Sequence, residues 1–235
     1  MNRQGMVMIS SGSETLDTLL GGGIHSGMIT DVYGESGAGK TQLCFTLAVN
    51  CIKNGGKVMF VDTAGTFRPE RIMEIGGMWD VLEKITYLRA LVTADQINAI
   101  QKIADLDPQL VIIDTVTGLF SVEYSGPSRH LAVMNHLRNL AMAALASRCA
   151  VVVTNMVRNV PTDVVDQPGR NVAHAISPVQ QREYLGSSVS IYSHIKLKLE
   201  IIDAKSSMFR AKLVQPPRAA AIEFGISTLG ISDLA

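Results

Sequence analysis

The segment of the sequence with the clearest chemical meaning is residues 34–41, which read Gly-Glu-Ser-Gly-Ala-Gly-Lys-Thr. This spacing is that of a phosphate-binding loop, in which glycines let consecutive backbone N–H groups point at phosphate oxygens. The lysine of such a loop reaches the β- and γ-phosphates, and the residue after it offers a hydroxyl to Mg²⁺. The sequence therefore predicts a site for ATP and Mg²⁺ formed by Gly34, Glu35, Ser36, Gly37, Ala38, Gly39, Lys40, Thr41 and Gln42.

A carboxylate that could share the metal ion with Thr41 is found at Asp114, which ends the apolar run 110–113. Such a run predicts a buried strand. The carboxyl ends of parallel strands form the edge where ligands bind in α/β sheets. Asp114 is therefore predicted to help hold Mg²⁺ through water. The alternative is an aspartate that caps a helix.

Strands and helices alternate along the chain around these residues, which predicts an α/β fold with a mostly parallel twisted sheet and helices on both faces. The expected parallel strands are residues 28–33, 58–61, 85–91, 110–114 and 150–154. The expected helices are residues 42–50, 69–76, 95–105 and 131–147. After a long polar segment, residues 191–203, 209–214 and 221–224 are expected to extend the sheet with antiparallel strands. We expect one domain over residues 1–235.

The composition limits the classes of protein to consider. The 235 residues are 47% hydrophobic and 18% charged, which is typical of a compact core, and the formal net charge of zero argues against a protein that coats nucleic acid by bulk charge. Cys44, Cys51 and Cys149 lack metal-ligand spacing and are expected to be buried thiols in a reducing compartment. No apolar run is long enough to span a membrane. These observations predict a cytoplasmic protein, nucleoid-associated if its source is prokaryotic.

Several strings in one order resemble the RecA/RadA-type recombinases. Residues 61–71 read Val-Asp-Thr-Ala-Gly-Thr-Phe-Arg-Pro-Glu-Arg, residues 153–155 read Val-Thr-Asn, and residues 185–188 read Leu-Gly-Ser-Ser. The resemblance covers nearly the whole chain and is strongest to recombinase paralogs such as archaeal RadB. It implies a RecA-like core in which Arg71 packs on adenine, although Arg71 could also be an ordinary surface arginine. The family's amino-terminal helical DNA-binding domain is not found in this sequence.

Two departures from the family pattern bear on catalysis. The family places a glutamate after Asp-Thr to polarise the attacking water, and here that residue is Ala64. The family places a glutamine after Thr-Asn to sense the γ-phosphate, and here that residue is Met156. Ser121 and Pro127 stand where the family's first DNA loop carries arginines. The resemblance therefore implies ATP binding with weak or absent hydrolysis, and no catalytic residue is assigned.

Basic residues in two further segments could contact DNA or a neighbouring protomer. The segment 158–184 corresponds to the family's second DNA loop and contains Arg158, Arg170 and Arg182, but three acidic residues balance these arginines. Weak binding of single-stranded DNA and a simple solvated loop are both compatible with this composition. Lys196 and Lys198 alternate on a predicted strand and so share a face. They are candidates to reach the nucleotide of a neighbouring protomer, or they could lie on a solvated sheet face.

Together these features predict an ATP-binding recombinase paralog that acts as an accessory or mediator in homologous recombination and DNA repair. Its expected partners are a main recombinase of the RadA type or other paralogs, with weak binding of single-stranded DNA, no membrane contact and a homo- or hetero-oligomeric state. The first alternative is a DNA-stimulated ATPase that performs strand exchange itself. The second is a RecA-fold regulatory ATPase that does not act on DNA.

Overall fold

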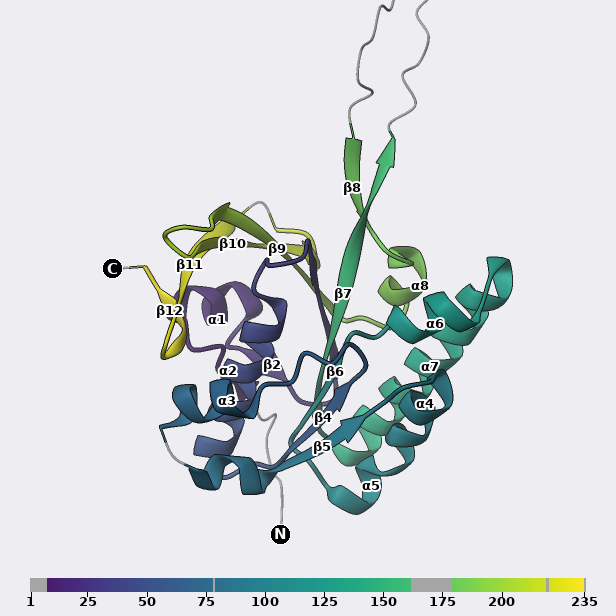
Figure 1. Cartoon of the computed structure of the whole chain (residues 1–235), viewed down its shortest axis with the longest axis horizontal. Helices are drawn as coiled ribbons and strands as arrows, with labels where there is room; N and C mark the ends of the chain where they lie inside the picture. Colours follow the sequence, from purple (N-terminus) through teal and green to yellow (C-terminus); the bar gives the residue numbers. More distant parts are fainter. Residues whose placement is uncertain (1–7, 78, 162–178, 219, 235) are drawn as a thin grey trace, which may run out of the picture.

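The computed structural model describes residues 8–77, 79–161, 179–218 and 220–234. One large sheet runs through the molecule with strand order β12-β11-β10-β9-β3-β7-β6-β4-β5 (Figure 1). Its parallel part consists of β3 (Ile29–Gly34), β4 (Val58–Asp62), β5 (Ile85–Arg89), β6 (Leu110–Asp114), β7 (Ala150–Pro161) and β9 (Ile195–Asp203). Its antiparallel part adds β10 (Met208–Gln215), β11 (Ala221–Ser227) and β12 (Gly230–Asp233) to β9. The predicted fold class is confirmed.

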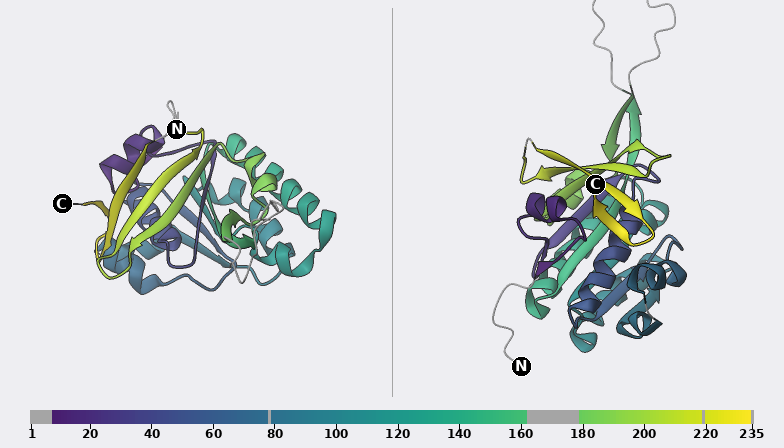
Figure 2. Two further views of the ribbon diagram at one scale, coloured as in Figure 1. Left: turned by 90° about the horizontal axis from the view of Figure 1, so that it is seen from above. Right: turned by 90° about the vertical axis from the view of Figure 1, so that its left-hand side faces the viewer.

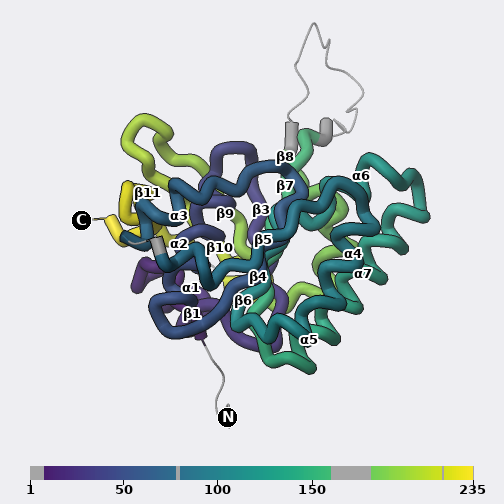
Figure 3. The backbone as a smooth tube through the Cα atoms, turned by 60° about the horizontal axis from the view of Figure 1, so that its bottom comes forward, coloured from purple at the N-terminus to yellow at the C-terminus, as the bar shows by residue number. Residues whose placement is uncertain are grey.

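Helices cover both faces of the sheet, as the tube in Figure 3 makes visible. One face carries α1 (Glu14–Leu20), α2 (Lys40–Lys53) and α3 (Pro69–Gly76). The other face carries α4 (Thr93–Gln101), α5 (Ile103–Leu106), α6 (Gly118–Glu123), α7 (Gly126–Ser147) and α8 (Gly186–Ser190). A 3-10 helix, η1 (Trp79–Lys84), leads into β5, and β1 (Met8–Ile9) pairs with β2 (Ile24–His25) as a separate small sheet. None of the helices within the described ranges is both long and apolar enough to cross a membrane.

The continuous apolar runs in the central strands follow from this two-sided burial. In β6, Leu110 and Ile112 pack in the core beneath α2, while Val111 and Ile113 pack in the core beneath α7. Successive side chains of a strand point to opposite faces, so a strand buried on both faces is expected to be mostly apolar along its length. All three cysteines are free and buried, as expected, and burial raises the pKa of Cys51 to about 12.

The polar segment after Asn155 differs most from expectation. We expected a loop beginning near Arg158, but β7 continues to Pro161 and pairs with β8 (Val179–Glu183) as an antiparallel hairpin. The described arms of this hairpin project from the body of the molecule (Figure 2). Two smaller differences concern element bounds. The expected helix 95–105 is divided into α4 and α5 at Lys102, and the expected strand 191–203 begins only at Ile195, after helix α8.

Candidate functional site

The phosphate-loop residues lie between β3 and α2, at the carboxyl edge of the parallel strands. Gly34 can carry no side chain, because a Cβ there would lie 2.3 Å from the carbonyl oxygen of Leu199. Gly39 caps α2 with a φ of 87°, a left-handed conformation that favours glycine. The Lys40 ammonium donates to the carbonyl oxygens of Gly34 at 2.9 Å and Glu35 at 2.7 Å. Burial lowers the pKa of Lys40, and the charge of Asp114 opposes that shift.

Thr41 and Asp114 lie side by side, as the predicted metal site requires. The Thr41 hydroxyl donates to the Asp114 carboxylate at 2.7 Å. The hydroxyl of Thr66 donates to the same carboxylate at 2.9 Å, and that of Thr154 donates to its other oxygen. Mg²⁺ prefers such oxygen donors and is usually held by one or two protein groups together with phosphates and water. The residues present therefore fit this ion.

A cavity of about 530 Å³ opens in front of these groups. Its size falls within the range of roughly 300–1,000 Å³ that small-molecule sites occupy. Seven of the nine predicted loop residues line it, while Ala38 is buried and Glu35 is not part of the wall. The remaining wall is formed by Ala64, Thr66, Asp114, Thr115, Met156, Val157, Ser207, Phe209 and Ile226. The cavity therefore combines a polar loop with an apolar surface from β10 and β11.

Asp62, the acid nearest to Ala64 in the sequence, is occupied by structural contacts. Its carboxylate accepts backbone N–H groups from Ala64 at 3.0 Å and Gly65 at 2.6 Å, and from Thr66 and Phe67 at 3.2 Å each. Asp62 is 1% exposed and does not line the cavity. Among the described residues that line it, Asp114 is the only carboxylate.

Met156 lies where the resemblance puts the γ-phosphate sensor. It pairs with Gly34 across the β3–β7 register, it lines the cavity, and the residue is 43% exposed. A thioether is at most a weak hydrogen-bond acceptor and has no N–H to donate to a phosphate. Met156 therefore lines the cavity but lacks the chemistry of a phosphate sensor.

Arg71 lies outside the cavity lining. Its Nε donates to the Gln42 side chain at 2.8 Å, and its Nη atoms donate to the carbonyl oxygens of Ser227 and Thr228 in the β11–β12 turn. Arg71 therefore ties the start of α2 to the C-terminal strands. Its predicted contact with adenine remains a prediction.

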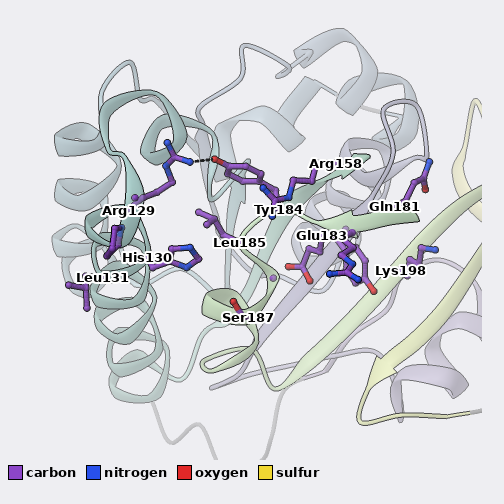
Figure 4. Close-up of a pocket in the computed structure, with 15 residues that line it drawn as sticks. Arg129, His130, Leu131, Arg158, Gln181, Glu183, Tyr184, Leu185, Ser187 and Lys198 are labelled. Carbon is purple, nitrogen blue, oxygen red and sulfur yellow. Dashed lines mark hydrogen bonds between the residues drawn. The ribbon is translucent and has the colours of Figure 1, made fainter. Parts of the chain in front are cut away.

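A second cavity, of about 1070 Å³, lies between the start of α7 and the foot of the β7–β8 hairpin (Figure 4). Four cationic side chains and one carboxylate line it: Arg129, Arg158, Arg182, Lys198 and Glu183. Arg158 and Arg182, both predicted DNA contacts, are direct partners across the hairpin. Arg170 lies outside the described residues.

Sequence reasoning missed Arg129, which the start of α7 at Gly126 brings to this cavity. Its guanidinium donates to the Tyr184 hydroxyl at 2.7 Å and to the Tyr124 carbonyl oxygen at 2.7 Å. The Arg158 guanidinium lies 5.9 Å from the centre of the Tyr184 ring (Figure 4). Pro127, which would favour a helix start, was the signal available in the sequence.

The two lysines predicted to reach a neighbouring protomer are placed differently. Lys196 is 4% exposed, pairs with Asp31 at 3.0 Å and with Glu183, and donates to the Ser190 hydroxyl at 2.9 Å. Lys198 is 25% exposed and pairs with Glu200 at 2.5 Å. Burial and the nearby charge of Glu183 raise the pKa of Asp31 well above its usual value. In this structure Lys198 is therefore the more accessible of the two lysines.

The sheet order, the loop between β3 and α2 and the cavity at the carboxyl edge define a RecA-like core of the phosphate-loop class. Residues 2–234 match the family model described as Rad51. The DNA repair and recombination protein RadA of Cenarchaeum symbiosum (strain A) is 39% identical over 72% of this chain and 48% of its own length. The DNA repair protein RAD51 homolog 1 of Arabidopsis thaliana is 39% identical over 98% of this chain and 70% of its own length. The DNA repair protein RAD51 of Saccharomyces cerevisiae is 38% identical over 67% of this chain and 44% of its own length.

The chain belongs to the Rad51 family. The matched region spans about half the length of the RadA and yeast relatives. The relatives named above are DNA repair proteins, so the family confirms the predicted connection with recombination and repair.

Proposed function

We propose that this protein is an ATP-binding recombinase paralog that acts as an accessory of homologous recombination, with weak or absent ATP hydrolysis. The observation that carries the proposal is the composition of the first cavity. Lys40, Thr41 and Asp114 offer groups suited to phosphate and metal, while Ala64 and Met156, which also line the cavity, stand where the resemblance puts the water-activating glutamate and the phosphate-sensing glutamine. Such a site favours binding of ATP·Mg²⁺ over its turnover.

Two features argue that no nearby acid replaces the missing glutamate. The Asp62 carboxylate is buried and accepts four backbone N–H groups, so it is poorly placed to accept a proton from water. Asp114 is surrounded by three hydroxyl groups and is needed for the metal ion. A general base must lie within hydrogen-bond reach of the proton it removes.

The second cavity supports weak binding of single-stranded DNA. The hairpin is neutral in composition, but its fold gathers Arg158 and Arg182 beside Arg129 and Lys198. Arg158 and Arg182 are direct partners across the hairpin, so their positive charges lie close together. A single-strand groove also needs aromatic platforms, and Tyr184 is already held between two arginines. The surface therefore offers attraction to phosphates more than stacking of bases.

In an accessory role, this protein would act together with a main recombinase of the RadA type or with other paralogs. ATP binding would order the loops that contact the partner, and the complex would help place the recombinase on single-stranded DNA. The narrower assignment to the RadB type belongs to the same proposal.

Two measurements test the proposal. Equilibrium binding of a fluorescent ATP analogue in Mg²⁺ should be tight in the wild type and lost in Lys40→Ala. Steady-state phosphate release should stay near background with or without oligothymidylate. DNA-stimulated turnover that Lys40→Ala abolishes would contradict the accessory role and support a strand-exchange ATPase. Failure to bind either oligothymidylate or a RadA-type recombinase would instead support a regulatory ATPase that does not act on DNA.

A further inference from the structure

Glu183, the last residue of β8, is held by groups from two other strands at the foot of the hairpin. Its Oε1 accepts from the Asn155 side chain at 2.8 Å, and its Oε2 pairs with Lys196 on β9. Lys196 in turn pairs with Asp31 on β3 at 3.0 Å. The Glu183 side chain is 9% exposed and that of Asp31 is fully buried. A buried carboxylate with this many partners has little freedom to move without breaking one of them.

The same strands lead directly to the nucleotide cavity. Thr154, the residue before Asn155, donates its hydroxyl to Asp114, the predicted metal ligand. Met156, the residue after Asn155, lines the cavity, and its N–H donates to the Asn155 side-chain oxygen at 2.9 Å. Asp31 lies three residues before Gly34 on β3. A shift of β7 or β3 on nucleotide binding would therefore move the groups that hold the Glu183 carboxylate.

The hairpin side of this contact leads to the second cavity. The Asn155 amide also donates to the Tyr184 carbonyl oxygen at 2.8 Å, so it holds two consecutive residues of the returning arm. The Tyr184 ring and hydroxyl in turn contact Arg158 and Arg129, which line the cavity together with Glu183 (Figure 4). One hydrogen bond, from the Asn155 amide to the Glu183 carboxylate, thus links the nucleotide cavity to the cationic cavity.

We infer that Glu183, held by Asn155, is the positioning residue that couples the nucleotide cavity to the cationic cavity of the hairpin. This inference rests on the proposed function, because it requires that the two cavities bind ATP and single-stranded DNA. The Asn155–Glu183 contact gives the chain a route between the cavities that does not need an amide at position 156. Two sites coupled in this way change each other's affinity by the same factor.

The test compares Glu183→Gln with Glu223→Gln. The first removes the buried charge that pairs with Lys196, and the second removes an exposed charge that pairs with Arg210 at 2.7 Å on the C-terminal strands. Both raise the net charge by one, so bulk electrostatic effects on DNA binding are matched. For each protein, the Kd of fluorescein-labelled oligothymidylate is measured with and without ATP·Mg²⁺. The Kd of a fluorescent ATP analogue is then measured with and without oligothymidylate.

We expect nucleotide to change the oligothymidylate Kd by about fivefold or more in the wild type and in Glu223→Gln. In Glu183→Gln this ratio should fall to within about twofold of one, and the reciprocal ratio for the ATP analogue should fall equally. Thermal melting shows whether the variants are folded. If Glu183→Gln does not fold, Asn155→Ala removes the Asn155–Glu183 hydrogen bond itself and leaves the Lys196 ion pairs in place.

The outcomes separate the inference from the proposed function. If the wild type binds no ATP analogue or no oligothymidylate, the proposed function is wrong. If the wild type binds both but their affinities are independent, or if a folded Glu183→Gln or Asn155→Ala keeps the wild-type ratio, the inference is wrong. Loss of affinity with an unchanged ratio would mark Glu183 as a structural residue only.

Discussion

Removal of the Asp62 carboxylate is the most direct perturbation of the loop that forms one wall of the nucleotide cavity. Asp62→Ala leaves four backbone N–H groups without their acceptor, and the two shortest of these bonds, to Gly65 and Ala64, measure 2.6 and 3.0 Å. A hydrogen bond to a charged group contributes roughly 1.5–3 kcal/mol. The two shortest bonds alone therefore set a loss of about 3 to about 6 kcal/mol.

Urea denaturation followed by far-UV circular dichroism measures this loss, because typical domains have about 5–15 kcal/mol of stability to lose. Asp62→Asn keeps one acceptor oxygen and should lie between Asp62→Ala and the wild type. The matched control is Asp203→Ala, which removes an exposed carboxylate that accepts the Lys205 N–H at 2.9 Å in a turn. The urea midpoint of this control should stay close to that of the wild type.

The same substitution has a consequence for binding, because Ala64 and Thr66 line the cavity. If the loop loses its anchor, ATP must order it on binding. Ordering one residue's backbone costs about 1–2 kcal/mol. We therefore expect the ATP Kd to rise about tenfold, which corresponds to about 1.4 kcal/mol. A loss of stability below about 1 kcal/mol, or an unchanged urea midpoint, would refute the role assigned to Asp62.

Three further predictions concern other parts of the molecule. Ala64→Glu places a carboxylate at the cavity wall and should raise the rate of steady-state phosphate release about a hundredfold. This is the lower end of the acceleration that a general base provides, because Met156 still offers no amide to the nucleotide. No gain would mean that the missing glutamate is not what limits turnover. Burial lowers the pKa of His136 to about 4, so the unfolded chain takes up a proton first as the pH falls below about 6.5. The urea midpoint should therefore decrease between pH about 6.5 and about 4, and this decrease should be smaller in His136→Gln. Lys196→Met leaves two buried carboxylates without their cation and should cost about 3–5 kcal/mol in urea denaturation, whereas Lys198→Met should barely change the midpoint and should weaken oligothymidylate binding.

The parallel core could be predicted because its signals are local in the sequence. Residues 110–113 are all apolar because the strand is buried on both faces, and the observed bounds of β6, Leu110–Asp114, are those expected. The hairpin was missed because its arms pair across an intervening polar segment, so neither arm shows the apolar alternation of a half-buried strand. Pairing between residues as far apart in sequence as Val157 and Glu183 cannot be seen in a short window of sequence.

The same distinction applies to the candidate site. The phosphate loop is contiguous, so its residues and their placement between β3 and α2 could be predicted together. The roles of Arg129 and Lys196 depend on which residues come close in space. Arg129 reaches Tyr184 from a different element, and Lys196 is buried only because Asp31 and Glu183 flank it. Charge balance along the segment 158–184 gave no indication of the cationic cavity, because Arg129 and Lys198 join Arg158 and Arg182 there from outside that segment.

A site that binds ATP without hydrolysing it changes what the nucleotide can do for this protein. A ligand shifts a conformational equilibrium only by its difference in affinity for the two states. Hydrolysis would end the ATP-bound state without any change in ligand concentration. In a site that does not hydrolyse ATP, the fraction of protein with ATP bound depends only on the free concentrations of nucleotide and DNA. The Asn155–Glu183 contact then sets how strongly binding of one ligand changes the affinity for the other. Asn155 lies between Thr154, which contacts Asp114, and Met156, which lines the cavity. On this reasoning, Ala64→Glu should change the lifetime of the ATP-bound state while leaving the ratio of DNA affinities intact, and Glu183→Gln should do the reverse.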